Sequence, residues 1–318
     1  MSGVGTTVVG EGATGVILGG GEHILSRRNL VVEGTLEHAA GAGPLRFASA
    51  ASVVVEEGGL VDLQGDVVWN YHSGTGSTFM NGGTVRKSGG GGAATLGHPV
   101  PENGVGGRME VFTGGLVLPD GVTGGGTFHA VEGAEVRYER GADLGDASFT
   151  GPGLQRFTGG TLTLTGACVG ENVRLEGSAL AGTHALSGAW DWTGGALGSG
   201  ETTVLEGAVL RVSGGGEHRM TSRAVVVEGV LEHAAGAGPL RFASAASVVV
   251  EEGGLVDLQG DVVWNYHSGT ASSVVNEGDF AKTAGTSSAA IHSHSFQNDG
   301  TIAALRGTLH FQRAPTLG

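Results

Sequence analysis

The sequence is poor in several residue types, and each scarcity excludes a class of protein. Its 318 residues include one cysteine, so an internal disulfide or a multi-cysteine metal site is excluded. Only two residues are lysine, Lys87 and Lys282, and no basic cluster offsets the net charge of −14, which argues against nucleic acid as a partner. With 7 prolines and 5% aromatic residues, the chain is neither collagen-like nor rich in aromatic core residues.

Long hydrophobic runs and targeting signals are scarce as well. No apolar stretch approaches the roughly 18 residues of a membrane-spanning helix, so no membrane span is predicted. The N-terminal residues have neither the charged nor the apolar region of a signal peptide. Cys168 stands in an apolar run and is interpreted as a core residue rather than a catalytic thiol. We therefore expect either a cytoplasmic protein or, preferably, a segment of a longer exported chain.

Glycine is what the chain has in abundance, with 64 residues. Each glycine disfavours a helix interior by about 1 kcal/mol, so long helices are excluded. The apolar residues amount to 39% of the chain, enough to build a core, and wholesale disorder is therefore excluded. An all-β protein with many turns is predicted.

The chain contains a long internal duplication. Residues 226–270 repeat residues 31–75 with one change, Thr35 to Val230, at an offset of 195 positions. Weaker similarity extends the two copies to residues 6–75 and 202–270, and residues 86–189 between them are less regular. We expect residues 1–318 to form one continuous domain.

A shorter period runs inside the duplication. Stretches of β-forming residues end at Glu-Gly or Asn-x-Gly corners that recur about every 22 to 25 residues, a spacing typical of solenoids. Propeller blades need about 40 residues or more, and the leucine-rich repeat pattern is absent. The sequence therefore predicts a single-stranded parallel β-helix, or β-solenoid, of roughly 12 to 13 coils with two or three short strands each.

Three segments support a resemblance to known repeat proteins. Trp192–Val204 with Glu206–Leu210 resembles a WxGGxLxGxGxTxV unit, and Ser273–Gly285 and Phe296–Phe311 resemble xFxNxGT units. Such units are similar to those in the β-helical shafts of filamentous-haemagglutinin and autotransporter-type adhesins of bacteria. The likeness covers most of residues 6–85 and 190–312. It implies an extracellular or cell-surface location, with carbohydrate or other surface components as partners.

One local pattern suggests a binding site, because aromatic residues recur in a chain that has few. Trp69, Tyr71 and His72 lie in a WNYH motif, and the duplication repeats it as Trp264, Tyr266 and His267. Strand alternation would place Trp and Tyr on one face and Asn and His on the other. If the aromatics face outward, they form a platform for sugar rings, and if they face inward, they fill the core, which we favour.

Catalysis is the main alternative, because many β-helices are polysaccharide lyases or hydrolases. The carboxylate pairs Asp62/Asp66, Asp257/Asp261 and Asp143/Asp146 are interpreted as turn residues, although Asp143 and Asp146 with Arg137 and Arg140 could form a unique site. His292 and His294 are interpreted as an exposed strand face rather than metal ligands.

We therefore predict a non-catalytic structural or adhesive segment without cofactors or metals. Uncapped solenoid ends would allow self-association. An intracellular scaffold is a further alternative to the exported segment.

Overall fold

The computed structural model describes residues 1–312 and 315–317. In these residues all regular structure is β-strand, and the strands stack in parallel as a β-solenoid of about 14 coils with roughly 22 residues per coil. The prediction of a parallel β-helix is confirmed. The chain divides into two compact units, Met1–Thr158 and Gly159–Gly318. Among the described residues, no helix is long and apolar enough to cross a membrane.

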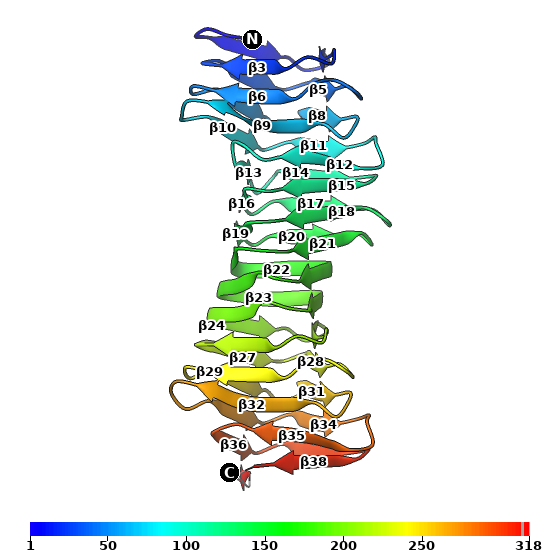
Figure 1. Cartoon of the computed structure of the whole chain (residues 1–318), viewed down its shortest axis with the longest axis vertical. Coiled ribbons are helices and arrows are strands. Elements are labelled where there is room, and N and C mark those ends of the chain that lie inside the picture. The colour runs from blue at the N-terminus through cyan, green and yellow to red at the C-terminus, as the bar shows by residue number, and fades with distance from the viewer. Residues whose placement is uncertain (313–314, 318) are drawn as a thin grey trace. The chain divides into compact units, whose positions relative to one another are not determined.

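Each coil of the first unit contributes one strand to each of three faces, as the stacked strands in Figure 1 show. Face 1 consists of β1 (Thr6–Val9), β4 (Asn29–Val32), β7 (Ser52–Val55), β10 (Thr78–Asn81), β13 (Pro101–Asn103), β16 (Thr123–Gly124) and β19 (Gly141–Gly145). Face 2 consists of β2 (Thr14–Ile17), β5 (Thr35–His38), β8 (Leu60–Leu63), β11 (Thr84–Lys87), β14 (Arg108–Val111), β17 (Thr127–Ala130) and β20 (Ser148–Thr150). Face 3 consists of β3 (His23–Ser26), β6 (Leu45–Ala48), β9 (Val68–Ser73), β12 (Ala93–Leu96), β15 (Gly115–Leu118), β18 (Glu135–Tyr138) and β21 (Leu154–Phe157).

The second unit begins with three long, bent strands and then repeats the three-faced pattern. The long strands are β22 (Thr161–Leu175), β23 (Ala179–Trp192) and β24 (Ala196–Val204). Within this unit, face 1 consists of β27 (Arg223–Val227), β30 (Ser247–Val250), β33 (Ser273–Asn276), β36 (Ser295–Asn298) and β39 (Thr316–Leu317). Face 2 consists of β25 (Val209–Val212), β28 (Val230–His233), β31 (Leu255–Leu258), β34 (Asp279–Lys282) and β37 (Thr301–Ala304). Face 3 consists of β26 (His218–Thr221), β29 (Leu240–Ala243), β32 (Val263–Ser268), β35 (Ser288–His292) and β38 (Thr308–Phe311).

The coils are not all of one length, which explains why the structure has slightly more of them than predicted. Arg108 pairs with Thr127, 19 residues later. Thr161 pairs with Ala179, 18 residues later. These short coils lie in the region whose sequence is less regular than the duplicated segments.

The core follows from strand alternation. On face 1, Leu30, Val53 and Phe79 are Cα partners on successive coils, and all three are buried. Their neighbours Val31, Val54 and Met80 point outward, because successive side chains of a strand project to opposite faces. Small and branched apolar residues thus form continuous interior rows.

Glycine is required at the corners for two different reasons. Gly58 has a left-handed backbone, with φ of 84°, which residues with a Cβ adopt at a cost. Gly83 is instead confined by its neighbours, because a Cβ there would lie 2.3 Å from the carbonyl oxygen of Glu56. Close stacking of one corner on the next therefore demands glycine even where its backbone freedom is not used.

Candidate functional site

The WNYH motif forms the central part of β9 on face 3. A β-bulge in this strand affects the direction in which its side chains point. Tyr71 pairs with Phe47, but Ser73 pairs with Ala48, so His72 is an extra residue in the ladder. β32 has the same bulge, at His267. A bulge bends the strand and redirects its side chains. The expectation that Trp and Tyr share one face is therefore wrong: Trp69 is 1% exposed, whereas Tyr71 is 49% exposed.

The two tryptophans belong to the interior, the placement that the sequence favoured. The Trp69 Nε1–H group donates a hydrogen bond to His38 Nδ1 at 2.8 Å, and His38 Nε2 donates to the carbonyl oxygen of Gly43 at 2.9 Å. Trp264, His233 and Gly238 repeat these contacts at 2.7 and 3.0 Å. A ligand on the surface can reach neither indole, so a sugar platform would depend on Tyr71 and Tyr266.

These contacts fit only a neutral imidazole, because one ring nitrogen accepts a hydrogen bond while the other donates. Burial lowers the pKa of His38 below its ordinary value of 6.5. Burial likewise lowers the pKa of His233 to about 4. The titratable groups that face these rings are His23 and His218, respectively.

Around Tyr71 the surface carries a set of polar side chains, here named the first corner cluster: Glu22, Arg46, Asn70, Tyr71, His72 and His98. Arg46 forms an ion pair with Glu22 and donates from Nη1 to the carbonyl oxygen of Tyr71 at 3.3 Å. The His72 Nδ1 atom lies 3.9 Å from Glu22. The ring of Tyr71 meets the His98 ring edge-on, with centroids 5.0 Å apart.

The second unit contains the matching cluster, here named the second corner cluster: Glu217, Arg241, Asn265, Tyr266, His267 and His294. Arg241 Nε lies 2.9 Å from Glu217. The Tyr266 hydroxyl donates to the carbonyl oxygen of Gly269 at 2.7 Å, and its ring meets His294 edge-on at 4.3 Å. His98 and His294 come from coils whose sequences differ, yet each places a histidine against the tyrosine.

The backbone next to both clusters is strained. Ser49 and Ala50 have φ of 46° and 58°, and Ser244 and Ala245 have φ of 52° and 61°. Left-handed conformations of non-glycine residues are costly, and they concentrate at functional positions. The strain is thus a further feature that the two corners share.

A second polar motif was missed at the sequence level. Lys87 is completely buried, and its ammonium group lies 3.0 Å from Asp66 Oδ1 and 3.2 Å from the carbonyl oxygen of Gly90. Lys282 repeats this contact with Asp261, also at 3.0 Å. The hydrogen bond from each lysine lowers the pKa of its aspartate partner. The sequence does contain a feature that predicts this motif, because the only two lysines of the chain are separated by the duplication offset of 195.

The two arginines considered for catalysis form ion pairs with carboxylates outside the proposed Asp143/Asp146 pair. Arg137 contacts Glu135 and Glu139. Arg140 lies 3.5 Å from Asp120. Among the described residues, no three His, Cys, Asp or Glu side chains converge to hold a metal ion. Cys168 is buried.

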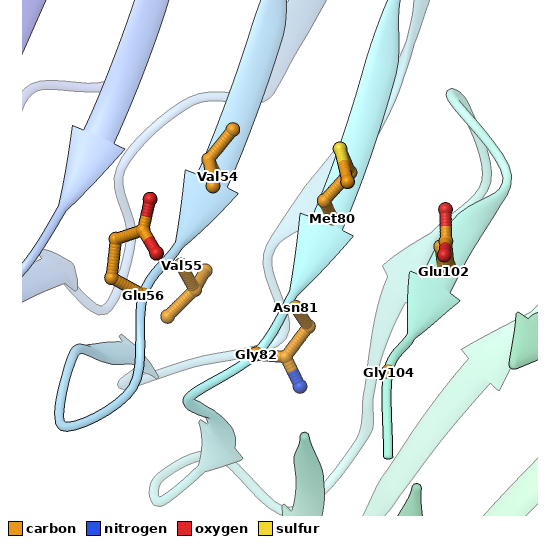
Figure 2. Close-up of a pocket in the computed structure, with 8 residues that line it drawn as sticks. All are labelled: Val54, Val55, Glu56, Met80, Asn81, Gly82, Glu102 and Gly104. Carbon is orange, nitrogen blue, oxygen red and sulfur yellow. The ribbon is translucent and has the colours of Figure 1, made fainter. Parts of the chain in front are cut away.

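A shallow hollow on face 1 of the first unit had no counterpart in the sequence predictions. It has a volume of about 180 Å³ and is lined by Val54, Val55, Glu56, Met80, Asn81, Gly82, Glu102 and Gly104 (Figure 2). Strand alternation places Val54, Met80 and Glu102 on the outer surface. Alternation alone does not predict a hollow, because a hollow also depends on the size of the neighbouring side chains.

No protein-family model matches the sequence, and no curated protein matches it. The assignment of the chain to the β-helical repeat fold therefore rests on its own sequence repeats and its own structure.

Proposed function

We propose that the protein is a non-catalytic β-solenoid shaft that presents two equivalent carbohydrate-binding corners, as a segment of a longer, exported, adhesin-like bacterial protein. The observation that carries the proposal is the recurrence of a tyrosine braced by a histidine, once in each unit, where Tyr71 is exposed and Tyr266 is half-buried. The partner would be a carbohydrate or another cell-surface component.

The chemistry of each corner suits a sugar. A tyrosine ring offers an apolar face for the C–H groups of a sugar and a polar tip, and the edge-on histidine fixes its orientation. Arginine, asparagine and histidine beside it provide donors and acceptors for hydroxyl groups. In the first corner cluster the Arg46 charge is balanced by Glu22, which favours an uncharged sugar over an acidic one.

Repetition of the site also supports binding rather than catalysis. Two weak sites on one chain strengthen attachment to a multivalent surface through avidity, whereas catalysis gains nothing comparable from a second copy. Arg137 and Arg140, the arginines considered for catalysis, each form an ion pair with a carboxylate, Glu135 and Asp120 respectively.

A glycan array tests the proposal with the double variant Tyr71→Ala/Tyr266→Ala. We expect the signal for the bound glycans to fall by roughly tenfold or more, since exposed aromatic anchors dominate such contacts. Equal signals for the variant and the parent protein would contradict the proposal. As a matched control, Tyr138→Phe alters a buried tyrosine of the first unit and should leave the array pattern unchanged.

A further inference from the structure

The hollow on face 1 combines an apolar floor with negative walls. Met80 is 45% exposed and lies beside Val54, its Cα partner on the preceding coil. Glu102 follows Met80 on the next coil. Figure 2 shows the carboxylates of Glu56 and Glu102 on either side of Met80.

Two of the residues that line the hollow are glycines, and both are replaced in the second unit. At the positions of Gly82 and Gly104, the second unit has Glu277 and Asp299. Val275 and Gln297 stand there in place of Met80 and Glu102, in the same strand register. The second unit thus lacks the exposed methionine and the counterpart of Glu102, and it has acidic side chains where the first unit has the two glycines. This combination of lining residues is therefore found in the first unit and not in the second.

Neither carboxylate of the hollow has a basic partner within residues 1–312 and 315–317. Apart from Asn81, whose side-chain Nδ2 donates to Asn103 Oδ1, the other lining residues are apolar or glycine. We infer that the hollow binds a cationic side chain with an aliphatic stem, an exposed arginine or lysine of a partner polypeptide. The stem lies on Met80 and Val54, and the charged head reaches Glu56 and Glu102. The net charge of −14 favours the approach of a basic partner to the protein as a whole.

Methionine methyl NMR provides a direct test, because the chain has four methionines. Met109 and Met220 are buried and serve as internal references for the fold. On addition of an end-blocked tetra-arginine peptide, we expect the Met80 methyl resonance to shift saturably while those of Met109 and Met220 stay in place. A tetra-glutamine peptide should leave all of them unchanged. An unmoved Met80 resonance with tetra-arginine would overturn the inference.

Variants separate the hollow from general attraction to an acidic protein. Glu56→Gln and Glu102→Gln should each weaken binding by roughly two- to five-fold, the effect of one exposed ion pair. Gly82→Gln, which fills the hollow without adding charge, should abolish the Met80 shift. Glu57→Gln removes the same charge beside the hollow and should have a smaller effect than Glu56→Gln. An equal effect of Glu57→Gln and Glu56→Gln would show nonspecific attraction and reject the site.

Discussion

The two copies of the repeated segment are almost identical in one region and differ at most positions in the next. Residues 31–75 and 226–270 are identical at 44 of 45 positions, whereas the following residues, 76–103 and 271–298, are identical at seven of 28. Both regions nonetheless keep the same strands and the same register. The second region therefore shows what a coil of this solenoid requires.

The seven retained residues share a location in the interior or at a corner. They are Ser77, Asn81, Gly83, Lys87, Gly90, Ala94 and Asn103, with counterparts 195 positions later. Asn81 Nδ2 donates to Asn103 Oδ1 at 2.7 Å, and Asn276 donates to Asn298 at the same distance. Buried polar groups need partners, so such ladders resist change while the exposed positions diverge.

Removal of the buried indoles should have the largest effect and tests the equivalence of the two copies. Trp69→Ala and Trp264→Ala each leave a large cavity and an unpartnered histidine nitrogen. We expect each to reduce the free energy of unfolding by about 3–5 kcal/mol. Urea denaturation should give similar losses for the two variants. A loss confined to one of them would show that the identical segments are not energetically equivalent.

Acid should weaken the same interior contacts. Because the pKa of His233 is about 4 in the fold against an ordinary 6.5, the fold favours the neutral ring. This stabilisation is complete above pH 6.5 and is lost as the pH falls toward 4, a loss of roughly 3 kcal/mol. Urea denaturation between pH 7.5 and 4.5 should show it.

Variants identify the source of that pH dependence. His233→Gln keeps a donor and an acceptor but does not titrate, so its stability should vary less over the same pH range. An unchanged pH dependence in His233→Gln would exclude this histidine as the cause.

Substitution of a corner glycine that both copies retain tests whether close stacking of the corners requires glycine. In Gly83→Ala the new Cβ would lie 2.3 Å from a backbone oxygen, and Gly278→Ala meets the same obstacle. We expect each to lose about 1–3 kcal/mol of stability in thermal or urea unfolding. Gly82→Ala, where the nearest atom is 3.3 Å away, is the matched control and should lose less. Equal losses at 82 and 83 would contradict the account of the corner.

The smallest effect is expected at the one position that differs between residues 31–75 and 226–270. Thr35 and Val230 are both partly exposed on face 2. Thr35→Val and Val230→Thr should each change stability by no more than about 0.5 kcal/mol. A larger change in urea denaturation would mean that the two copies have adapted to different surroundings.

Most of the fold but only part of the candidate site could be predicted from the sequence. Recurring corners and alternating apolar residues predict stacked coils, because both patterns are local. The orientation of Tyr71 was missed, since the bulge at His72 arises from pairing with a strand more than 20 residues earlier. The ion pair between Lys87 and Asp66 was missed, because it forms only when neighbouring coils stack. The hollow at Met80 depends on which neighbouring positions lack side chains.

The most direct test of the proposed function is the number of glycans that each chain binds. The protein is immobilised, and the glycan with the strongest array signal is titrated over the parent, Tyr71→Ala, Tyr266→Ala and the double variant. We predict that each single variant halves the binding capacity with an unchanged dissociation constant, and that the double variant abolishes binding. Full capacity in the double variant, or complete loss in only one of the single variants, would contradict two equivalent sites.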